Sequence, residues 1–419
     1  MSRSDNDIRI EDLGSPIPTE AHMHAQRIAR TEPIRLTAAA VLDSAINECG
    51  GLRPRTLDFT SRLEEWLTSI AEEPQRSALG KKIMFQHAVR FCTQRLLLEE
   101  LLHVHPEIND IEIKSPLIIL GLPRSGSTHL VNLIARDSKF RSLSRWECEE
   151  PLPNHHELAV TGTDNRRQRC IQQLEYRRSL LPHLAAMKPY DADDTAEEFW
   201  LQGLDFGGYV LDCMSLLRPW KSQGKDRDQT QHYEFMKTVL KALQWQRGPE
   251  RWILKTPDHA GQIRALTTVF PDATVVVTHR DPMASLQSVA TLSAYRARLE
   301  YTSFDLKDTV HYWAAVLQNW LDSVMCHGDL IDKQRRVDVT FEELTANHRS
   351  VVERIYSVAD INMTSAAEWQ LESFARRHGR GVRGRMIYNL AEDFDVDIRV
   401  IADRFASYLR SFPIAREMS

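Results

Sequence analysis

The sequence lacks the features of a membrane-spanning, exported or disulfide-linked protein. Its longest apolar stretches, around residues 117–122 and 273–278, are far shorter than the roughly 20 residues of a membrane-spanning helix. The first residues are polar and acidic, without the apolar core of a signal peptide. The six cysteines lie far apart and include no C-x-x-C pair, a pattern typical of reduced thiols and not of a zinc site. We therefore expect a cytoplasmic protein that binds no metal.

An excess of positive charge is also absent. The 419-residue chain carries 53 Lys and Arg residues against 58 Asp and Glu residues, a formal net charge of −5. Proteins that bind nucleic acid usually have a strong basic excess, so we expect no nucleic-acid partner. A small anionic ligand needs only a few well-placed cations and therefore stays open.

Hydrophobic periodicity predicts three regions along the chain. We expect a loose tail over residues 1–30 and helices over residues 31–114, where apolar residues recur at helical spacing. Over residues 115–419, short apolar strands alternate with amphipathic helices, which is typical of a parallel sheet covered on both faces. One strand is expected at the start of the run LIILGLPRSGSTHLVNLIA, and three more are expected within residues 252–254, 274–278 and 336–340. Residues from about 155 to 245 are mostly helical in pattern and predict an inserted lobe.

A glycine-containing loop follows the first strand. It runs from Gly121 to Thr128 with the pattern G-x4-G-x-[ST] and lies between a strand and a helix. Such a loop turns backbone N–H groups inward, and the following helix adds its positive end, so that an anion is held. The residues expected to contact the anion are Arg124, Ser125, Gly126, Ser127 and Thr128. A plain connection between strand and helix is the alternative.

One position separates this loop from that of nucleotide hydrolases. Ser127 stands where those enzymes have the lysine that reaches the β- and γ-phosphates, and Arg124 supplies the positive charge instead. No strand clearly ends in an acidic residue suited to Mg²⁺. These differences disfavour an NTP hydrolase, and a kinase with a modified loop stays open as an alternative.

A second anion site is predicted where the third strand ends. Arg280 precedes a helix that Asp281 is suited to cap, and Ser288 lies about two turns into that helix. A guanidinium binds phosphate through two hydrogen bonds, and a hydroxyl can add another donor. Both loops lie at the carboxyl ends of adjacent strands, where open parallel sheets bind ligands. Alternatively, Arg280 forms a surface ion pair and Ser288 is an ordinary helix residue.

These motifs resemble those of the sulfotransferases that use 3′-phosphoadenosine 5′-phosphosulfate (PAPS), in particular a bacterial-type subgroup with an N-terminal helical extension. The resemblance is carried by LPRSGSTHL, VVVTHRDPMASLQSVATL and LKTPDH. It implies a P-loop-type α/β/α fold of three layers around a parallel sheet, with the helical extension and the inserted lobe. It also implies that the first loop binds the 5′-phosphosulfate and that Arg280 and Ser288 bind the 3′-phosphate.

A late basic run, R-R-H-G-R-G-V-R-G-R, gains a meaning from the same resemblance. Family members close the nucleotide site with a basic, glycine-bearing loop, and here Arg380, Gly381 and Arg383 would occupy it. The glycines would let the backbone approach a phosphate. A solvated basic loop is the alternative.

Sulfuryl transfer needs a cation near the leaving group and a base near the acceptor. Lys255, at the end of the second strand, resembles the lysine with which the family neutralises the bridging oxygen. Glu198 and His259 are two candidates for the base. Glu198 lies in an acidic stretch similar to one in the subgroup, and His259 offers an imidazole, which exchanges protons near neutral pH. We favour Glu198, because Pro257 occupies the position of the histidine that acts as base in other branches.

The acidic stretch also has a purely structural interpretation. Glu198 would then be an acidic residue in the first turn of a helix capped by Asp194 or Thr195.

The sequence thus predicts an enzyme, a sulfotransferase that moves a sulfuryl group from PAPS to a hydroxyl by in-line transfer with a general base. Aromatic residues in the inserted lobe favour a small-molecule or lipid-like acceptor. Besides the kinase, a non-catalytic nucleotide-binding protein of the same fold is a second alternative to the sulfotransferase. A homodimer through the N-terminal helices stays open.

Overall fold

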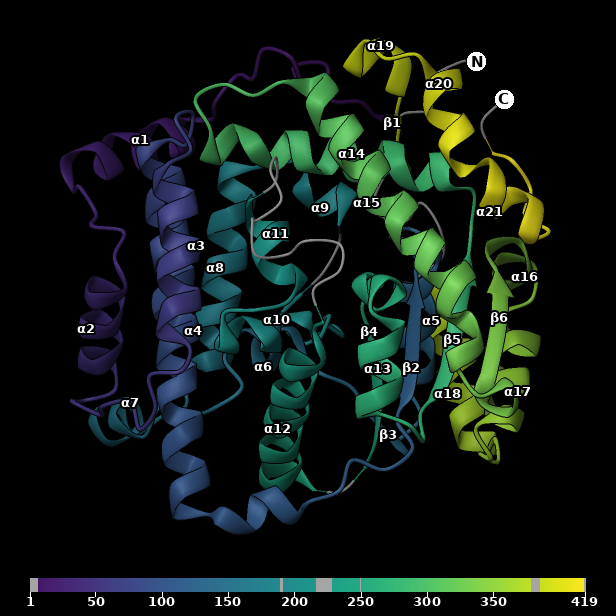
Figure 1. The fold of residues 1–419 in the computed structure, drawn as a ribbon, viewed down its shortest axis with the longest axis horizontal. Coiled ribbons are helices and arrows are strands. Elements are labelled where there is room, and N and C mark those ends of the chain that lie inside the picture. The colour runs from purple at the N-terminus through teal and green to yellow at the C-terminus, as the bar shows by residue number, and fades with distance from the viewer. Residues whose placement is uncertain (1–6, 189–190, 216–227, 249, 378–384, 418–419) are drawn as a thin grey trace.

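The chain folds around a five-stranded parallel sheet (Figure 1). The computed structural model describes residues 7–188, 191–215, 228–248, 250–377 and 385–417. The strands are β2 (Leu117–Gly121), β3 (Phe140–Arg141), β4 (Arg251–Lys255), β5 (Thr274–His279) and β6 (Arg336–Thr340). Their spatial order is β3-β4-β2-β5-β6. All four strands predicted from the sequence are confirmed, and β3 is a short edge strand that the sequence did not indicate.

Successive side chains of the three central strands, β4, β2 and β5, fill two separate hydrophobic cores. In β2, Ile118 and Leu120 belong to the larger core, whereas Leu117 and Ile119 belong to the smaller one. Since neighbouring side chains of a strand point to opposite faces, a strand buried on both faces has to be apolar throughout. This explains the continuous apolar runs of the sequence.

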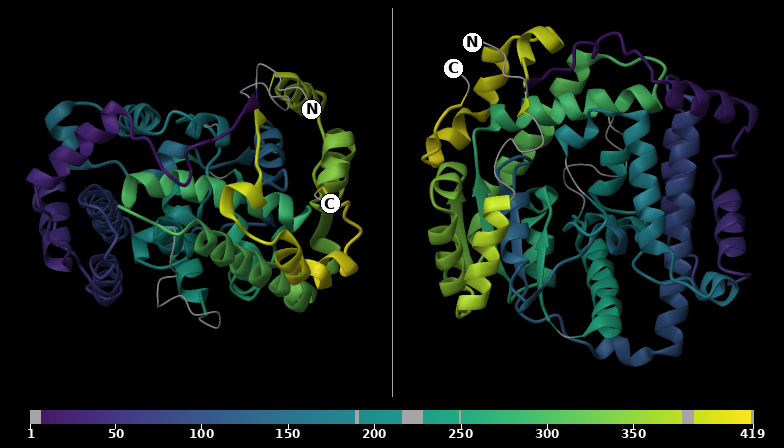
Figure 2. Two further views of the ribbon diagram at one scale, coloured as in Figure 1. Left: turned by 90° about the horizontal axis from the view of Figure 1, so that it is seen from above. Right: turned by 180° about the vertical axis from the view of Figure 1, so that it is seen from behind.

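Helices cover both faces of the sheet and complete the predicted α/β/α architecture. The larger core is lined by α12 (Thr230–Arg247), α13 (Ile263–Val269), α14 (Pro282–Glu300) and α15 (Leu306–His327). The smaller core is lined by α5 (Ser127–Ile134), α16 (Phe341–Ala346), α17 (His348–Val358) and α18 (Ser365–Arg377). Figure 2 shows the same layers from above and from behind.

The N-terminal part is helical from residue 20 onward. Its helices are α1 (Glu20–Thr31), α2 (Ala38–Glu48), α3 (Thr60–Ala71) and α4 (Ala78–Val104). The prediction of a loose tail over residues 1–30 is therefore wrong for residues 20–30. Thr19 caps α1 by accepting a hydrogen bond of 3.1 Å from the backbone N–H of His22, and Ala25 and Ala29 bury one face. Because those buried residues are small, the apolar face of α1 was not evident in the sequence.

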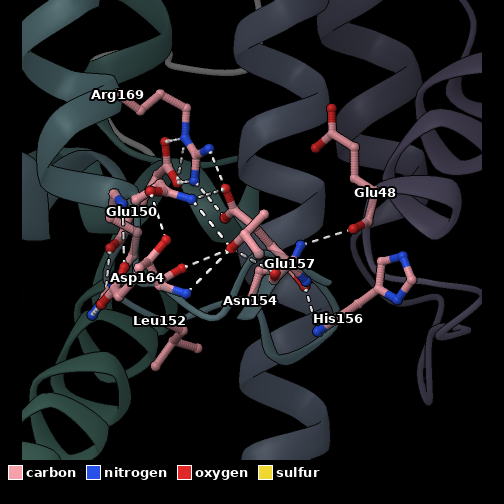
Figure 3. Close-up of polar contacts among 12 residues, drawn as sticks. Glu48, Glu150, Leu152, Asn154, His156, Glu157, Asp164 and Arg169 are labelled. Atoms are coloured by element: carbon pink, nitrogen blue, oxygen red, sulfur yellow. Dashed lines mark hydrogen bonds and ion pairs between the residues drawn. The ribbon is translucent and has the colours of Figure 1, made fainter. Parts of the chain in front are cut away.

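A series of short helices connects β3 to β4. They are α6 (Arg145–Glu149), α7 (His155–Thr161), α8 (Arg166–Leu180), α9 (Leu184–Met187), α10 (Phe199–Gln202), η2 (Gly203–Asp205) and α11 (Tyr209–Ser215), followed by α12. Arg169 of α8 forms ion pairs of 2.8 Å with Glu150, which precedes α7, and with Glu157, which lies in α7 (Figure 3). Asn154, which caps α7, donates to the carbonyl oxygen of Glu48 in α2 at 2.8 Å. These contacts fix the insertion against the N-terminal helices.

The remaining elements are short. They are β1 (Asp7–Ile8), β7 (Arg385–Met386), η1 (Pro106–Asp110), η3 (Pro257–Gly261), η4 (Gly328–Leu330), η5 (Lys333–Arg335), α19 (Leu390–Phe394), α20 (Ile398–Ala402), η6 (Asp403–Phe405) and α21 (Ala406–Ser411). The strands β1 and β7 pair in parallel, so chain segments far apart in sequence meet beside α19 and α20 (Figure 1). Within the described ranges, none of the helices combines the length and apolar composition needed to cross a membrane.

Candidate functional site

The loop between β2 and α5 contains two residues in the left-handed region of backbone conformation. Gly126 lies directly before α5 with a φ of 87°. Arg124 has a φ of 69°, which residues with a side chain rarely adopt. The backbone N–H of Ser125 donates to the carbonyl oxygen of Leu122 at 3.2 Å and closes the turn. Left-handed residues in a turn are typical of loops whose N–H groups converge on an anion.

This loop is held tightly against β5. Gly121 pairs with Thr278 in the sheet and has a φ of 139°. A Cβ atom on Gly121 would lie only 2.3 Å from the carbonyl oxygen of Thr278, which explains the glycine. Ser125 Oγ also contacts Thr278 Oγ1 at 2.6 Å. The first predicted anion site is therefore fixed to the strand that leads to the second.

Lys255, the last residue of β4, reaches the same loop. In the sheet it is paired with Ile119 of the neighbouring strand β2. Its Nζ lies 3.1 Å from Thr128 Oγ1 and 2.6 Å from Glu197 Oε1, and the residue is almost fully buried. The structure thus brings Lys255 and Thr128 together, because the end of β4 and the loop that follows β2 lie at the same edge of the sheet.

Glu197 is a residue of this site that was not predicted from the sequence. Besides Lys255, its carboxylate contacts Lys188 Nζ at 3.3 Å. Burial alone would raise the pKa of Glu197, but the charges of Lys188 and Lys255 and the hydrogen bonds from both lower it to about 2. The carboxylate of Glu197 beside the loop is therefore ionised at neutral pH while both lysines contact it. The signal that could have revealed it was its place next to Glu198 in the acidic stretch.

The two candidates for the base, Glu198 and His259, are hydrogen-bonded to each other. Glu198 Oε1 lies 2.7 Å from His259 Nε2, and Glu198 Oε2 accepts a hydrogen bond of 2.8 Å from the backbone N–H of Lys255. On the other side of the imidazole, His259 Nδ1 lies 2.6 Å from Tyr233 OH. All three of these side chains are 0 % exposed. The structure therefore joins the two rival residues in one enclosed polar chain that includes Tyr233.

The expected helix start at the acidic stretch is wrong. The helix α10 begins at Phe199, after Glu198, and no side chain caps it. Asp194 and Thr195 therefore do not act as its caps, and Glu198 does not lie in its first turn.

Asp258 is a second buried carboxyl group in the turn after β4. Burial raises its pKa to about 6, although the charge of His259 and a hydrogen bond of 2.5 Å from Thr256 Oγ1 act in the opposite direction. A fraction of the molecules therefore carries a proton on Asp258 near neutral pH.

Arg280 lies where β5 ends, as predicted, and Asp281 caps α14 by accepting a hydrogen bond of 3.0 Å from the backbone N–H of Met283. The Arg280 guanidinium lies over the ring of Phe341, 4.0 Å from its centroid. Its Nη1 donates to the carbonyl oxygen of Arg124 at 2.5 Å, which links the second predicted anion site to the first loop. Arg280 also forms an ion pair with Glu417.

The other predicted nucleotide ligands fall into two groups. Ser288 is buried on α14 and donates a hydrogen bond of 3.0 Å to Tyr388 OH. Arg380, Gly381 and Arg383 of the late basic run lie outside the described residues. In the part of the chain that is described, no group of three or more His, Cys, Asp or Glu side chains could hold a metal ion.

Comparison with known proteins points to one family. A family model described as "Sulfotransferase family" matches residues 116–365. The curated omega-hydroxy-beta-dihydromenaquinone-9 sulfotransferases Stf3 of Mycobacterium bovis and Mycobacterium tuberculosis are each 26% identical over 251 residues, which are 58% of this chain. The matched region spans 61% of the length of these relatives.

Solved structures of similar proteins extend the likeness to nearly the whole chain. Sulfotransferase STF9 from Mycobacterium avium superposes with a TM-score of 0.78 at 27% identity, covering 92% of this chain and 99% of that one. Sulfotransferase STF1 from Mycobacterium tuberculosis shares the fold with a TM-score of 0.73 at 22% identity, covering 88% of this chain and 98% of that one. The likeness includes the N-terminal helices as well as the sheet.

Proposed function

The chain belongs to the sulfotransferase family, and from this premise we propose that it transfers a sulfuryl group from PAPS to a hydroxyl of a small or lipid-like acceptor. The observation that carries the proposal is the contact of Lys255 Nζ with Thr128 Oγ1 at the loop between β2 and α5. A cation and a hydroxyl donor are thereby fixed together at the position where a phosphosulfate would lie.

The two predicted anion sites support PAPS as the donor. We propose that the loop from Arg124 to Thr128 binds the 5′-phosphosulfate and that Arg280 and Ser288 bind the 3′-phosphate. Arg280 supports this role because its guanidinium already binds a carboxylate through two nitrogen atoms, the geometry that phosphate also uses. Arg380, Gly381 and Arg383 stay predicted ligands of the same nucleotide.

Charge stabilisation at the reacting group is the role that we propose for Lys255. Its ammonium is nearly excluded from water, so its attraction for charge that develops on the leaving phosphate is weakly screened. Thr128 contributes a hydroxyl at the same place. Neither group has to move far, since Lys255 is the last residue of β4 and Thr128 lies in the first turn of α5.

The base is a carboxylate of the Glu197–Glu198 pair in our proposal, and the geometry favours Glu197. Both oxygens of Glu198 are engaged by Lys255 N–H and His259, and the side chain has no exposed surface. The side chain of Glu197 is 15% exposed and contacts Lys255 Nζ, beside the loop. When Lys255 is drawn to charge on the transferring group, Glu197 keeps its contact with Lys188 but loses the lysine that lowers its pKa from the other side, so it becomes a stronger base. Glu198 and His259 then act as positioning residues.

A lipid-like acceptor is supported by the curated relatives, whose name assigns them a hydroxylated dihydromenaquinone. In this chain, the aromatic residues Phe199 and Trp200 directly follow the two carboxylates, and Phe199 packs against Tyr209. An apolar or amphiphilic alcohol therefore suits the surroundings of the proposed base. We also propose a reducing, cytoplasmic location, which is supported by the six cysteines, all described and all unpaired. The homodimer stays a prediction.

The direct test is transfer of radiolabelled sulfate from PAPS to a panel of alcohols, including long-chain isoprenoid alcohols, with EDTA present. We expect metal-independent transfer, which a Lys255→Ala variant loses. Phosphoryl transfer from ATP that EDTA abolishes would favour the modified kinase instead. Tight binding of adenosine 3′,5′-bisphosphate together with unreacted PAPS across the panel would favour the non-catalytic binding protein.

A further inference from the structure

The carboxylate of Glu417 lies where the proposed function requires a phosphate. Arg280 Nε and Nη2 donate to its two oxygens at 2.5 and 2.7 Å, the paired geometry with which a guanidinium also binds phosphate. Resting on the proposed function, we infer that Glu417 is an internal occupant of the 3′-phosphate position. Binding of the nucleotide then has to displace it.

The segment that carries Glu417 is anchored on both sides of Arg280. The backbone N–H of Glu417 donates to Asp281 Oδ2 at 2.8 Å, immediately after Arg280 in sequence. Five residues before Glu417, the ring of Phe412 stacks on His279, immediately before Arg280, with 4.4 Å between the centroids. The carboxylate is thus delivered to the guanidinium by contacts with both of its chain neighbours.

The second proposed ligand of the 3′-phosphate is engaged as well. Ser288 Oγ donates its hydrogen bond to Tyr388 OH at 3.0 Å. Tyr388 lies just beyond β7, which is paired with β1, and Glu417 lies beyond α21. Two separate parts of the C-terminal region therefore satisfy the side chains that we assign to the 3′-phosphate.

Displacement of Glu417 follows from charge. A phosphate and a carboxylate repel each other and compete for the same edge of the guanidinium, so only one can occupy it. The apparent affinity for the nucleotide is therefore lower than the intrinsic affinity, because only the molecules in which Glu417 is not paired with Arg280 can bind the 3′-phosphate. Phe341 under the guanidinium and the carbonyl oxygen of Arg124 at Nη1 keep Arg280 in place during the exchange.

Glu417 competes only with the 3′-phosphate, so the experiment compares a nucleotide that has this phosphate with one that lacks it. We would titrate the full chain and its Glu417→Gln variant calorimetrically with adenosine 3′,5′-bisphosphate and, separately, with adenosine 5′-monophosphate. Loss of one partly exposed ion pair should tighten binding of the bisphosphate roughly three- to tenfold. Binding of the monophosphate, which has no 3′-phosphate, should stay the same. The matched control is Glu353→Gln, which breaks a surface ion pair of 2.9 Å with Arg349 on α17.

An Arg280→Ala background separates this inference from the proposed function. In that background, Glu417→Gln should leave the affinity for the bisphosphate unchanged, whereas Arg280→Ala alone should lower that affinity. If Arg280→Ala lowers the affinity for the bisphosphate but Glu417→Gln in the otherwise unchanged chain does not alter it, the inference fails and the proposed function stands. Equal tightening of both nucleotides would also overturn it, because a general loss of negative charge would then be the cause. If the chain does not bind the bisphosphate at all, both proposals fail.

Discussion

Glu198 and His259 share a hydrogen bond of 2.7 Å in a part of the protein where neither side chain has exposed surface. Burial raises the pKa of Tyr233 well above its usual range, so its phenol stays protonated and can donate to His259 Nδ1. With Tyr233 as the donor at Nδ1, the imidazole carries its proton on Nε2 and donates to the Glu198 carboxylate, and a doubly protonated imidazole donates from Nε2 as well. In both arrangements Glu198 is the acceptor.

Glu198→Gln should therefore destabilise the protein. The amide nitrogen would face the Nε2–H of His259 donor to donor, and flipping the amide instead places that nitrogen against the N–H of Lys255. We expect the free energy of unfolding to fall by about 1–3 kcal/mol, the range for a buried group left without its partner. Urea denaturation measures the change, with Glu353→Gln on the exposed side of α17 as the control. Equal stability of Glu198→Gln and wild type would contradict the proposed arrangement.

Glu197→Gln should act on the reaction and not on nucleotide binding. It keeps the shape of the side chain but removes the carboxylate beside Lys255, so we expect kcat to fall about a hundredfold or more, the effect of a lost general base. Affinity for adenosine 3′,5′-bisphosphate should be equal or higher, because a negative charge beside the loop has been removed. Steady-state kinetics and a bisphosphate titration check the two parts. If Glu197→Gln keeps near-normal turnover while Glu198→Gln or His259→Ala abolishes it, the base belongs to the enclosed pair.

The fold and the position of Lys255 could be predicted because they follow from local patterns. Strands buried on both faces need continuous apolar runs, and parallel strands bring their carboxyl ends to one edge, so the loop and Lys255 had to be close. The choice between Glu197 and Glu198 could not be made in the same way. The two residues are adjacent in sequence, and which one meets Lys255 Nζ depends on the irregular turn before α10. Glu417 was out of reach for another reason, since its partner Arg280 is 137 residues away.

Asp258→Asn should change how stability depends on pH. The folded-state pKa of Asp258 is raised to about 6 from an ordinary value of 3.8, so the neutral form stabilises the fold. That stability is fully present below the unfolded-state pKa and is lost as the pH rises through about 6. Asparagine is neutral at every pH and should not lose it.

The comparison of wild type with Asp258→Asn isolates this effect. Between about pH 4.5 and about pH 7.5, the free energy of unfolding of wild type should fall by about 2 kcal/mol relative to that of the variant. This is the change that a shift of about two pKa units implies. Thermal unfolding at both pH values measures it, and Asp110→Asn, at an exposed side chain, serves as the control. A difference between wild type and Asp258→Asn that stays constant over this range would mean that Asp258 is ionised at both ends of it.

Gly121→Ala should be among the most damaging single changes in the loop. At a φ of 139° alanine is strained, and its Cβ would lie 2.3 Å from the carbonyl oxygen of Thr278, so that β2 and β5 would have to separate. Gly162→Ala is the matched control, because Gly162 also has a positive φ, 72°, but nothing lies within 4 Å of the added atom. We expect a loss of about 1 kcal/mol for Gly162→Ala, from backbone strain alone, and of about 3 kcal/mol or more for Gly121→Ala. Urea denaturation measures the free energy of unfolding of both variants. Equal losses would mean that β5 moves away from the added methyl group without destabilising the protein.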